Sequence, residues 1–137
     1  MQKIILDTNV IVSSLIQKNY PFLIVEHCIE GNVEICISNE IIQEYIEVLN
    51  RPKFSRFYDF KINADFLITR ISEMAELFEP QNKLNLIKDE TDNRLLELAQ
   101  LAKADFIITG NTNDFNLENF EGTKIVTPKE YWEKYKQ

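Results

Sequence analysis

The chain alternates between short apolar runs and longer segments whose apolar residues recur every three or four positions. Short apolar runs bounded by polar or turn-forming residues predict buried strands. They lie at Lys3–Leu6, Val33–Ile37, Leu84–Ile87, Asp105–Thr109 and Lys124–Val126. The run at Leu84–Ile87 is the weakest of these, and the core of Asp105–Thr109, Phe-Ile-Ile, is the clearest.

The longer segments have the period of amphipathic helices. Ser38 is a plausible N-cap, and Thr127 with Glu130 has the pattern of a capping box. A basic, aromatic connector, Arg51–Lys61, follows the third predicted helix. We expect helices at Thr8–Ile16, from Pro21 to Gly31, from Ser38 to about Asn50, along the stripe Leu67, Ile71, Met74 and Phe78 until Pro80, over Asp92–Lys103 and from Thr127 onward.

Strands separated by helices indicate crossover connections, and crossovers join parallel strands. We therefore expect an α/β protein, a three-layer α/β/α sandwich with a central parallel sheet of four to five strands. No linker, internal repeat or low-complexity segment interrupts the 137 residues. A chain of this length fits one domain of ordinary size, so residues 1–137 are expected to form a single domain.

Composition narrows the class of protein. With 45% hydrophobic and 27% charged residues the chain is neither disordered nor membrane-embedded. No apolar run approaches the roughly 20 residues of a membrane span, and Asp7-Thr8-Asn9 interrupts the one candidate leader segment. Cys28 and Cys36 are too few for a disulfide framework. We expect two small buried residues of a cytoplasmic protein.

The sequence lacks the glycine motifs and the histidine pairs on which many enzymes depend. The three glycines, Gly31, Gly110 and Gly122, form neither a phosphate-binding loop nor a dinucleotide fingerprint nor a nucleophile elbow. The single histidine, His27, lies among apolar neighbours in a predicted helix and is expected to be structural. Any catalysis must therefore come from carboxylates.

Acidic residues fall where an open α/β sheet binds its ligands, beyond the carboxyl ends of the strands. Asp7 ends the first predicted strand, and Asp114 follows the fourth. Asp92 is in helical phase with Leu95 and Ala99, so it projects toward the sheet. Converging carboxylates repel unless a cation intervenes, and oxygen ligands without paired thiolates or imidazoles favour Mg²⁺ or Mn²⁺.

Taken singly, each acid also has a structural explanation. Asp7 could cap the following helix, and Asp92 could be a first-turn acid favoured by the helix dipole. Asp89 precedes the helix and can point outward. Glu44 lies beside the apolar arc of its helix and could be a solvated surface acid. The residues alone leave these alternatives open.

The order and spacing of several segments resemble the PIN-domain family, particularly the bacterial VapC-type toxin components of toxin–antitoxin pairs. The resemblance runs from Ile4 to about Trp132. The segments that carry it are Leu6–Val10, the Ser38–Leu49 helix with Glu44, Asp89–Asn93, Ala104–Asn111 and Ile125–Pro128.

This resemblance implies a Mg²⁺-dependent ribonuclease that hydrolyses phosphodiester bonds. The acidic quartet of the family would fall on Asp7, Glu44, Asp92 and a residue just after the fourth predicted strand. Here that residue is Asn111, whose amide brings no charge, and Asp114 is expected to supply the missing acid. Asp7 and Asp92 would bind the metal ion directly. The supporting residues would be Thr8, Asn9, Asp89, Thr109 and Asn111. Thr8 could equally serve helix packing, and Asn9 could equally cap the helix.

The resemblance also implies a cognate antitoxin and a homodimer as partners, with RNA as the substrate. A net charge of −7 opposes general nucleic-acid binding. The connector Arg51–Lys61 is the exception, because its cations alternate with aromatic residues. We expect Arg51, Lys53 and Arg56 to contact RNA. The alternatives are a solvated loop with core-packed aromatics and a protein interface.

Two other functions remain open at this stage. A phosphoaspartyl phosphatase of the haloacid-dehalogenase type also has an aspartate at the first strand tip. It uses a second aspartate two residues later, however, where this chain has Asn9. The other is a binding protein of the same fold whose catalysis has been weakened by Asn111.

Overall fold

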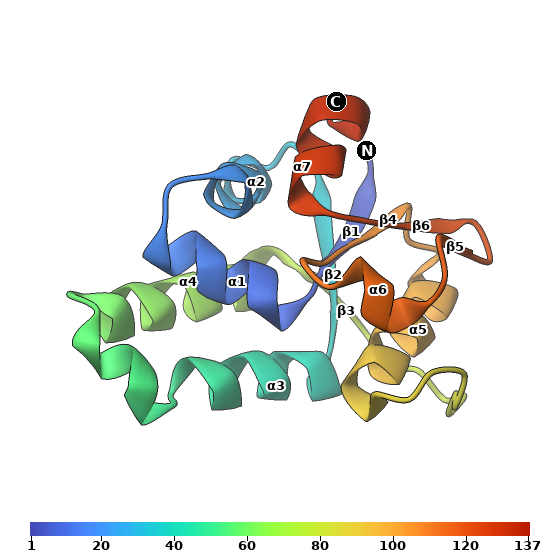
Figure 1. Ribbon diagram of the computed structural model, residues 1–137, viewed down its shortest axis with the longest axis horizontal. Coiled ribbons are helices and arrows are strands. Elements are labelled where there is room, and N and C mark those ends of the chain that lie inside the picture. The colour runs from blue at the N-terminus through green and yellow to red at the C-terminus, as the bar shows by residue number, and fades with distance from the viewer.

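The computed structural model describes residues 1–137 and has a six-stranded sheet at its centre (Figure 1). The strands are β1 (Lys3–Leu6), β2 (Glu34–Ser38), β3 (Glu76–Phe78), β4 (Phe106–Ile108), β5 (Asn119–Phe120) and β6 (Thr123–Val126). The helices are α1 (Thr8–Ile16), α2 (Tyr20–Ile29), α3 (Asn39–Leu49), α4 (Phe60–Met74), α5 (Glu90–Ala102), α6 (Thr112–Phe115) and α7 (Pro128–Glu130). A 3₁₀ turn (Pro52–Arg56) precedes α4, and a π-helical turn (Tyr131–Tyr135) follows α7.

The strand order is β3-β2-β1-β4-β6-β5, and every pairing is parallel except β5 with β6. Figure 1 shows α5 on one side of the sheet and α1, α2 and α7 on the other. The residues of β1 from Ile4 to Leu6 are fully buried between these layers. The expected three-layer α/β/α class is therefore confirmed, with six strands rather than four to five.

The expected strand at Leu84–Ile87 is wrong, and so is the expected helix as far as Pro80. Helix α4 ends at Met74, and the chain then pairs with β2 as β3, with Phe78 opposite Ser38. Side chains of α5 satisfy the backbone of the Leu84–Ile87 segment in place of a strand neighbour. The Leu84 N–H donates to Glu97 Oε2 at 2.7 Å. The N–H groups of Leu86 and Ile87 donate to Asn93 Oδ1 at 3.0 and 3.1 Å.

The other departure lies near the C-terminus. The extra strand β5 forms a hairpin with β6 through Glu121 and Gly122, whose φ angles of 51° and 91° suit a tight two-residue turn. The expected helix after Thr127 is present as α7 and the π-helical turn that continues it to Tyr135, and the capping box of Thr127 and Glu130 forms in both directions.

The expectations about three residues, Cys28, Cys36 and Ser38, hold in the fold. Cys28 and Cys36 are buried and unpaired. Ser38 caps α3 by accepting a hydrogen bond from the Ile41 N–H at 3.2 Å. No helix combines the length and the apolar composition that crossing a bilayer requires.

Candidate active site

The site lies where the direction of the sheet reverses. From β1 the chain proceeds to β2 and β3 on one side, and later to β4 and β6 on the other. Ligands of open α/β sheets bind in the crevice beyond the carboxyl ends of the strands at such a reversal. Asp7 directly follows β1, and Thr109 directly follows β4. These two residues therefore lie where such a crevice is expected.

Hydrogen bonds join the tips of β1 and β4. Asp7 Oδ2 accepts from Thr109 Oγ1 at 2.7 Å and from Asn9 Nδ2 at 3.1 Å. Asn9 Oδ1 in turn accepts from the Gly110 N–H at 3.0 Å. A Cβ atom at Gly110 would meet that oxygen at 3.4 Å, an ordinary contact distance. Asp7 occupies the N-cap position of α1 without making a side-chain cap bond, so capping does not explain this carboxylate.

Asp92 brings a second carboxylate to the crevice from the first turn of α5. The N-cap of that helix is Asp89, whose Oδ1 accepts from the Asp92 N–H at 3.1 Å. The Asp92 side chain is only 7% exposed, and no protein donor hydrogen-bonds its carboxylate. Its pKa is raised to about 7, first by burial and then by the charges of Asp7, Asp89, Asp114 and Glu44.

The pKa values of Asp7 and Glu44 are also raised. Burial raises the pKa of Asp7 against hydrogen bonds from Thr109, the Thr8 backbone and Asn9, which lower it. Glu44 lies half-buried on α3 and accepts from Thr8 Oγ1 at 3.4 Å. Its pKa is raised by burial and by the charge of Glu47. Three partly or fully buried acids therefore share one negative region.

The remaining candidate residues lie at the rim. Asp89 and Asp114 are exposed, and their charges act on Asp92. Asn111 is also exposed, and its N–H donates to Thr109 Oγ1 at 3.0 Å. The predicted acids therefore lie close enough for their charges to act on Asp92. Asp114 on α6 contributes a negative charge to this region, which the neutral amide of Asn111 cannot do.

Three residues of α5 that the sequence did not single out hold the segment leading to Asp89. Asn93 Nδ2 donates to the Ile87 carbonyl at 2.8 Å, in addition to the two bonds that its Oδ1 accepts. Arg94 Nη2 pairs with the buried Glu97 Oε2 at 2.6 Å and donates to the Leu84 carbonyl at 3.0 Å. A buried acid three residues after an arginine on the apolar side of a helix is the signal that could have revealed this pair.

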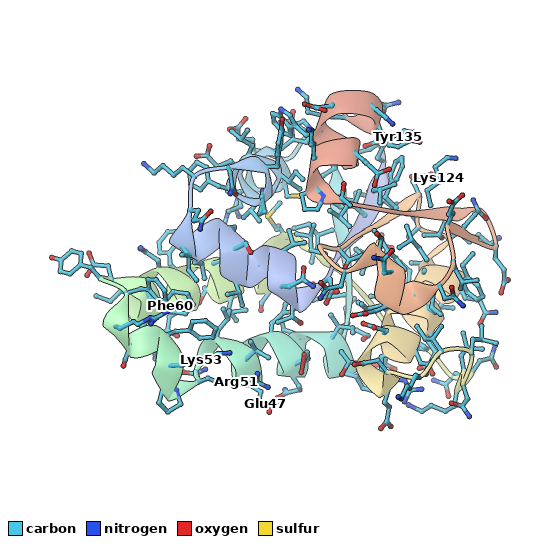
Figure 2. All side chains as sticks on the ribbon, in the orientation of Figure 1. Glu47, Arg51, Lys53, Phe60, Lys124 and Tyr135 are labelled. Atoms are coloured by element: carbon cyan, nitrogen blue, oxygen red, sulfur yellow. The ribbon has the colours of Figure 1, made fainter.

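The predicted RNA-binding connector is only partly available to a ligand. Phe54 and Phe60 are buried and stack on each other with ring centroids 4.8 Å apart, so they cannot stack on bases. Arg51 pairs with Glu47 across 3.7 Å, and its charge partly opposes the rise in the pKa of Glu44. Figure 2 shows Glu47, Arg51 and Lys53 along the end of α3 that lies away from α5. Arg51 therefore acts electrostatically on the candidate site through Glu44.

The donor set suits a hard cation that keeps much of its water. No three acidic, histidine or cysteine side chains stand close enough to enclose an ion by themselves. Mg²⁺ is commonly held by one or two carboxylates, with water and substrate phosphates as its other ligands. Asp7 and Asp92 meet that requirement, because both are buried carboxylates in a region of excess negative charge.

Comparisons with known proteins agree with this architecture. The family model described as PIN domain matches residues 3–113. An uncharacterized protein of Methanocaldococcus jannaschii is 28% identical over 144 residues, covering 98% of this chain and 92% of that protein. A chain in a crystal structure of VapBC2 from Rickettsia felis, bound to a DNA fragment from their promoter, superposes with a TM-score of 0.61 at 15% identity. That match covers 92% of this chain and 98% of the other.

Proposed function

The chain belongs to the PIN-domain family, and from this we propose that it is a Mg²⁺-dependent ribonuclease. PIN domains are generally nucleases that use divalent metal ions. The observation that carries the proposal is the Asp92 carboxylate, buried without a protein donor among the charges of four other acids. Such a group requires either a proton or a cation.

The residues of the crevice have distinct parts in the proposed reaction. When bound, Mg²⁺ would polarise a phosphate oxygen and favour deprotonation of an attacking water. Asp7 and Asp92 would hold the ion, and Thr109 and Asn9 fix the Asp7 carboxylate through the bonds at 2.7 and 3.1 Å. Glu44, whose raised pKa suits proton transfer, would orient the water as general base. Asp114 would add negative charge at the rim.

The direct test is cleavage of end-labelled single-stranded RNA with Mg²⁺, with and without a chelator. We expect internal cleavage that the chelator abolishes and that excess Mg²⁺ restores. RNA binding without cleavage would instead favour a non-catalytic binding protein of this fold. Release of terminal phosphate without internal cuts would favour a phosphatase.

We further propose that Arg51, Lys53 and Arg56 guide the RNA toward the crevice. Replacing all three by alanine should weaken RNA binding and reduce the dependence of log K on log salt by about 2, since each contact with a single strand contributes about 0.7. The matched control replaces Lys129, Lys134 and Lys136 of the C-terminal segment, which removes the same charge. Equal effects of the two triple variants in a fluorescence-anisotropy titration would refute the assigned role.

The fold match with a chain of the VapBC2 complex supports a protein partner. We propose that a cognate antitoxin binds this chain, that two copies form a dimer and that the protein acts in the cytoplasm. The exposed side chains of Ile62 and Phe66, four residues apart on α4, support a protein contact on this face, and Tyr58 is exposed just before the helix.

A further inference from the structure

Tyr45 of α3 connects that helix to the end of β1. Its side chain is fully buried, and its hydroxyl donates a hydrogen bond to the carbonyl of Leu6. Leu6 is the last residue of β1 and directly precedes Asp7. A buried tyrosine hydroxyl generally requires a partner, and here that partner belongs to the backbone that carries a candidate metal ligand.

The sheet leaves this carbonyl accessible to α3. On the β4 side the pairing of β1 continues to Leu6 opposite Ile108. On the β2 side the register ends at Ile4 opposite Ile35, although β2 itself continues to Ser38 beside β3. The Tyr45 hydroxyl therefore lies where a further bond from β2 would otherwise extend the ladder. The two strands part at this end, and α3 fills the opening.

The bond from Tyr45 to Leu6 links the positions of two acids, because Asp7 follows Leu6 and Glu44 precedes Tyr45. Glu44 is the neighbour of Tyr45 on α3, and its own bond to the crevice, from Thr8 Oγ1, is long at 3.4 Å. Burial, followed by the charges of Asp7 and others that include Glu44, raises the pKa of the Tyr45 hydroxyl, so the hydroxyl remains a donor at ordinary pH. The Tyr45 bond is buried, whereas the bond from Thr8 at the start of α1 is partly buried and long, so Tyr45 is the firmer link between α3 and this end of the sheet.

We propose that Tyr45 is a positioning residue for the metal site, holding the Asp7 backbone and Glu44 in a fixed relation. This inference rests on the proposed metal-dependent function. Groups that orient metal ligands without touching the ion commonly change metal affinity or activity by about 10–100-fold when they are removed. Tyr45 would act in the same way through the Leu6 carbonyl.

The test compares Tyr45→Phe with Tyr131→Phe, a closely matched control. Tyr131 is also fully buried, and its hydroxyl donates to Gln2 Oε1 at 2.6 Å, beside the opposite end of β1. Both variants remove the hydroxyl of a fully buried tyrosine, and with it one hydrogen bond near the same strand. The measurement is the unfolding temperature as Mg²⁺ is added. We expect the Mg²⁺ concentration at the midpoint of this titration to be about tenfold higher for Tyr45→Phe than for the wild type. We expect Tyr131→Phe to leave it unchanged.

Activity provides the second readout. Tyr45→Phe should lower kcat and raise the Mg²⁺ requirement while KM for RNA stays constant. Wild-type Mg²⁺ response and kcat in Tyr45→Phe would overturn the role of Tyr45, as would equal losses in the two variants. A wild-type protein without Mg²⁺ response or cleavage would instead overturn the proposed function.

If Tyr45→Phe does not fold, ring-fluorinated tyrosine at position 45 keeps the ring and the hydroxyl but makes the donor more acidic. The Mg²⁺ requirement should then shift from the wild-type value. An unchanged requirement would overturn the proposal.

Discussion

Asp7→Asn is expected to lower the rate of RNA cleavage by roughly a thousandfold, the size of loss seen when a preorganised electrostatic contact at a reacting centre is removed. Asparagine keeps the size and shape of the side chain, and its amide oxygen can still accept from Thr109. The change therefore removes mainly the negative charge at the tip of β1. Initial rates on labelled RNA at saturating Mg²⁺ measure the effect.

The matched control is Asp105→Asn. Asp105 lies just before β4, at the end of that strand opposite to Thr109, and its Oδ2 accepts from the Lys3 N–H at 2.8 Å. This variant removes the same charge away from the crevice and should cleave RNA at the wild-type rate. Full Mg²⁺-dependent cleavage by a clean preparation of Asp7→Asn would exclude Asp7 from the metal site.

Asp92→Asn is expected to stabilise the protein while it abolishes cleavage. The pKa of Asp92 is raised from 3.8 to about 7, so the folded state holds this proton more tightly than the unfolded state does. Each pKa unit corresponds to about 1.4 kcal/mol, which sets an upper limit of about 4 kcal/mol, and nearby solvent reduces it. We expect a gain of about 2 kcal/mol in the free energy of unfolding above pH 7.

The pH dependence follows from the sign of that shift. Without metal, wild-type stability due to Asp92 should be highest below about pH 4, fall as pH rises toward about 7, and level off above it. Asp92→Asn should lose much of this slope, and the control Asp105→Asn should keep it. Mg²⁺ should stabilise the wild type at pH 8 but not Asp92→Asn. Urea titrations across this pH range would contradict the assignment if Asp92→Asn were less stable than wild type at pH 8.

Local patterns were sufficient for the parts of the site that depend on local geometry. The apolar run before Asp7 places this residue at a strand tip, and helical phase directs Asp92 toward the sheet. Both expectations hold, because strand and helix periodicity decide which side chains are buried. The order of helices and strands likewise indicates the parallel sheet, and the reversal between β1 and β4 brings the two tips together.

Features that depend on pairing between distant segments were not predictable from local patterns. Leu84–Ile87 has the composition of a strand, yet Asn93 and Glu97 take its N–H groups, so the third strand forms at Glu76–Phe78 instead. Tyr45 belongs to an apolar arc by its spacing, and only the fold shows that its hydroxyl reaches the Leu6 carbonyl. Side-chain bonds across many residues of sequence override local preference in both cases.

A crystal soaked in Mn²⁺ tests the shared metal site most directly, because anomalous scattering locates the ion independently of the protein model. We expect one strong anomalous peak beyond the ends of β1 and β4, with a carboxylate oxygen of Asp7 and one of Asp92 in contact with the ion. A fully occupied peak elsewhere, with both of these carboxylates free of metal, would contradict the site.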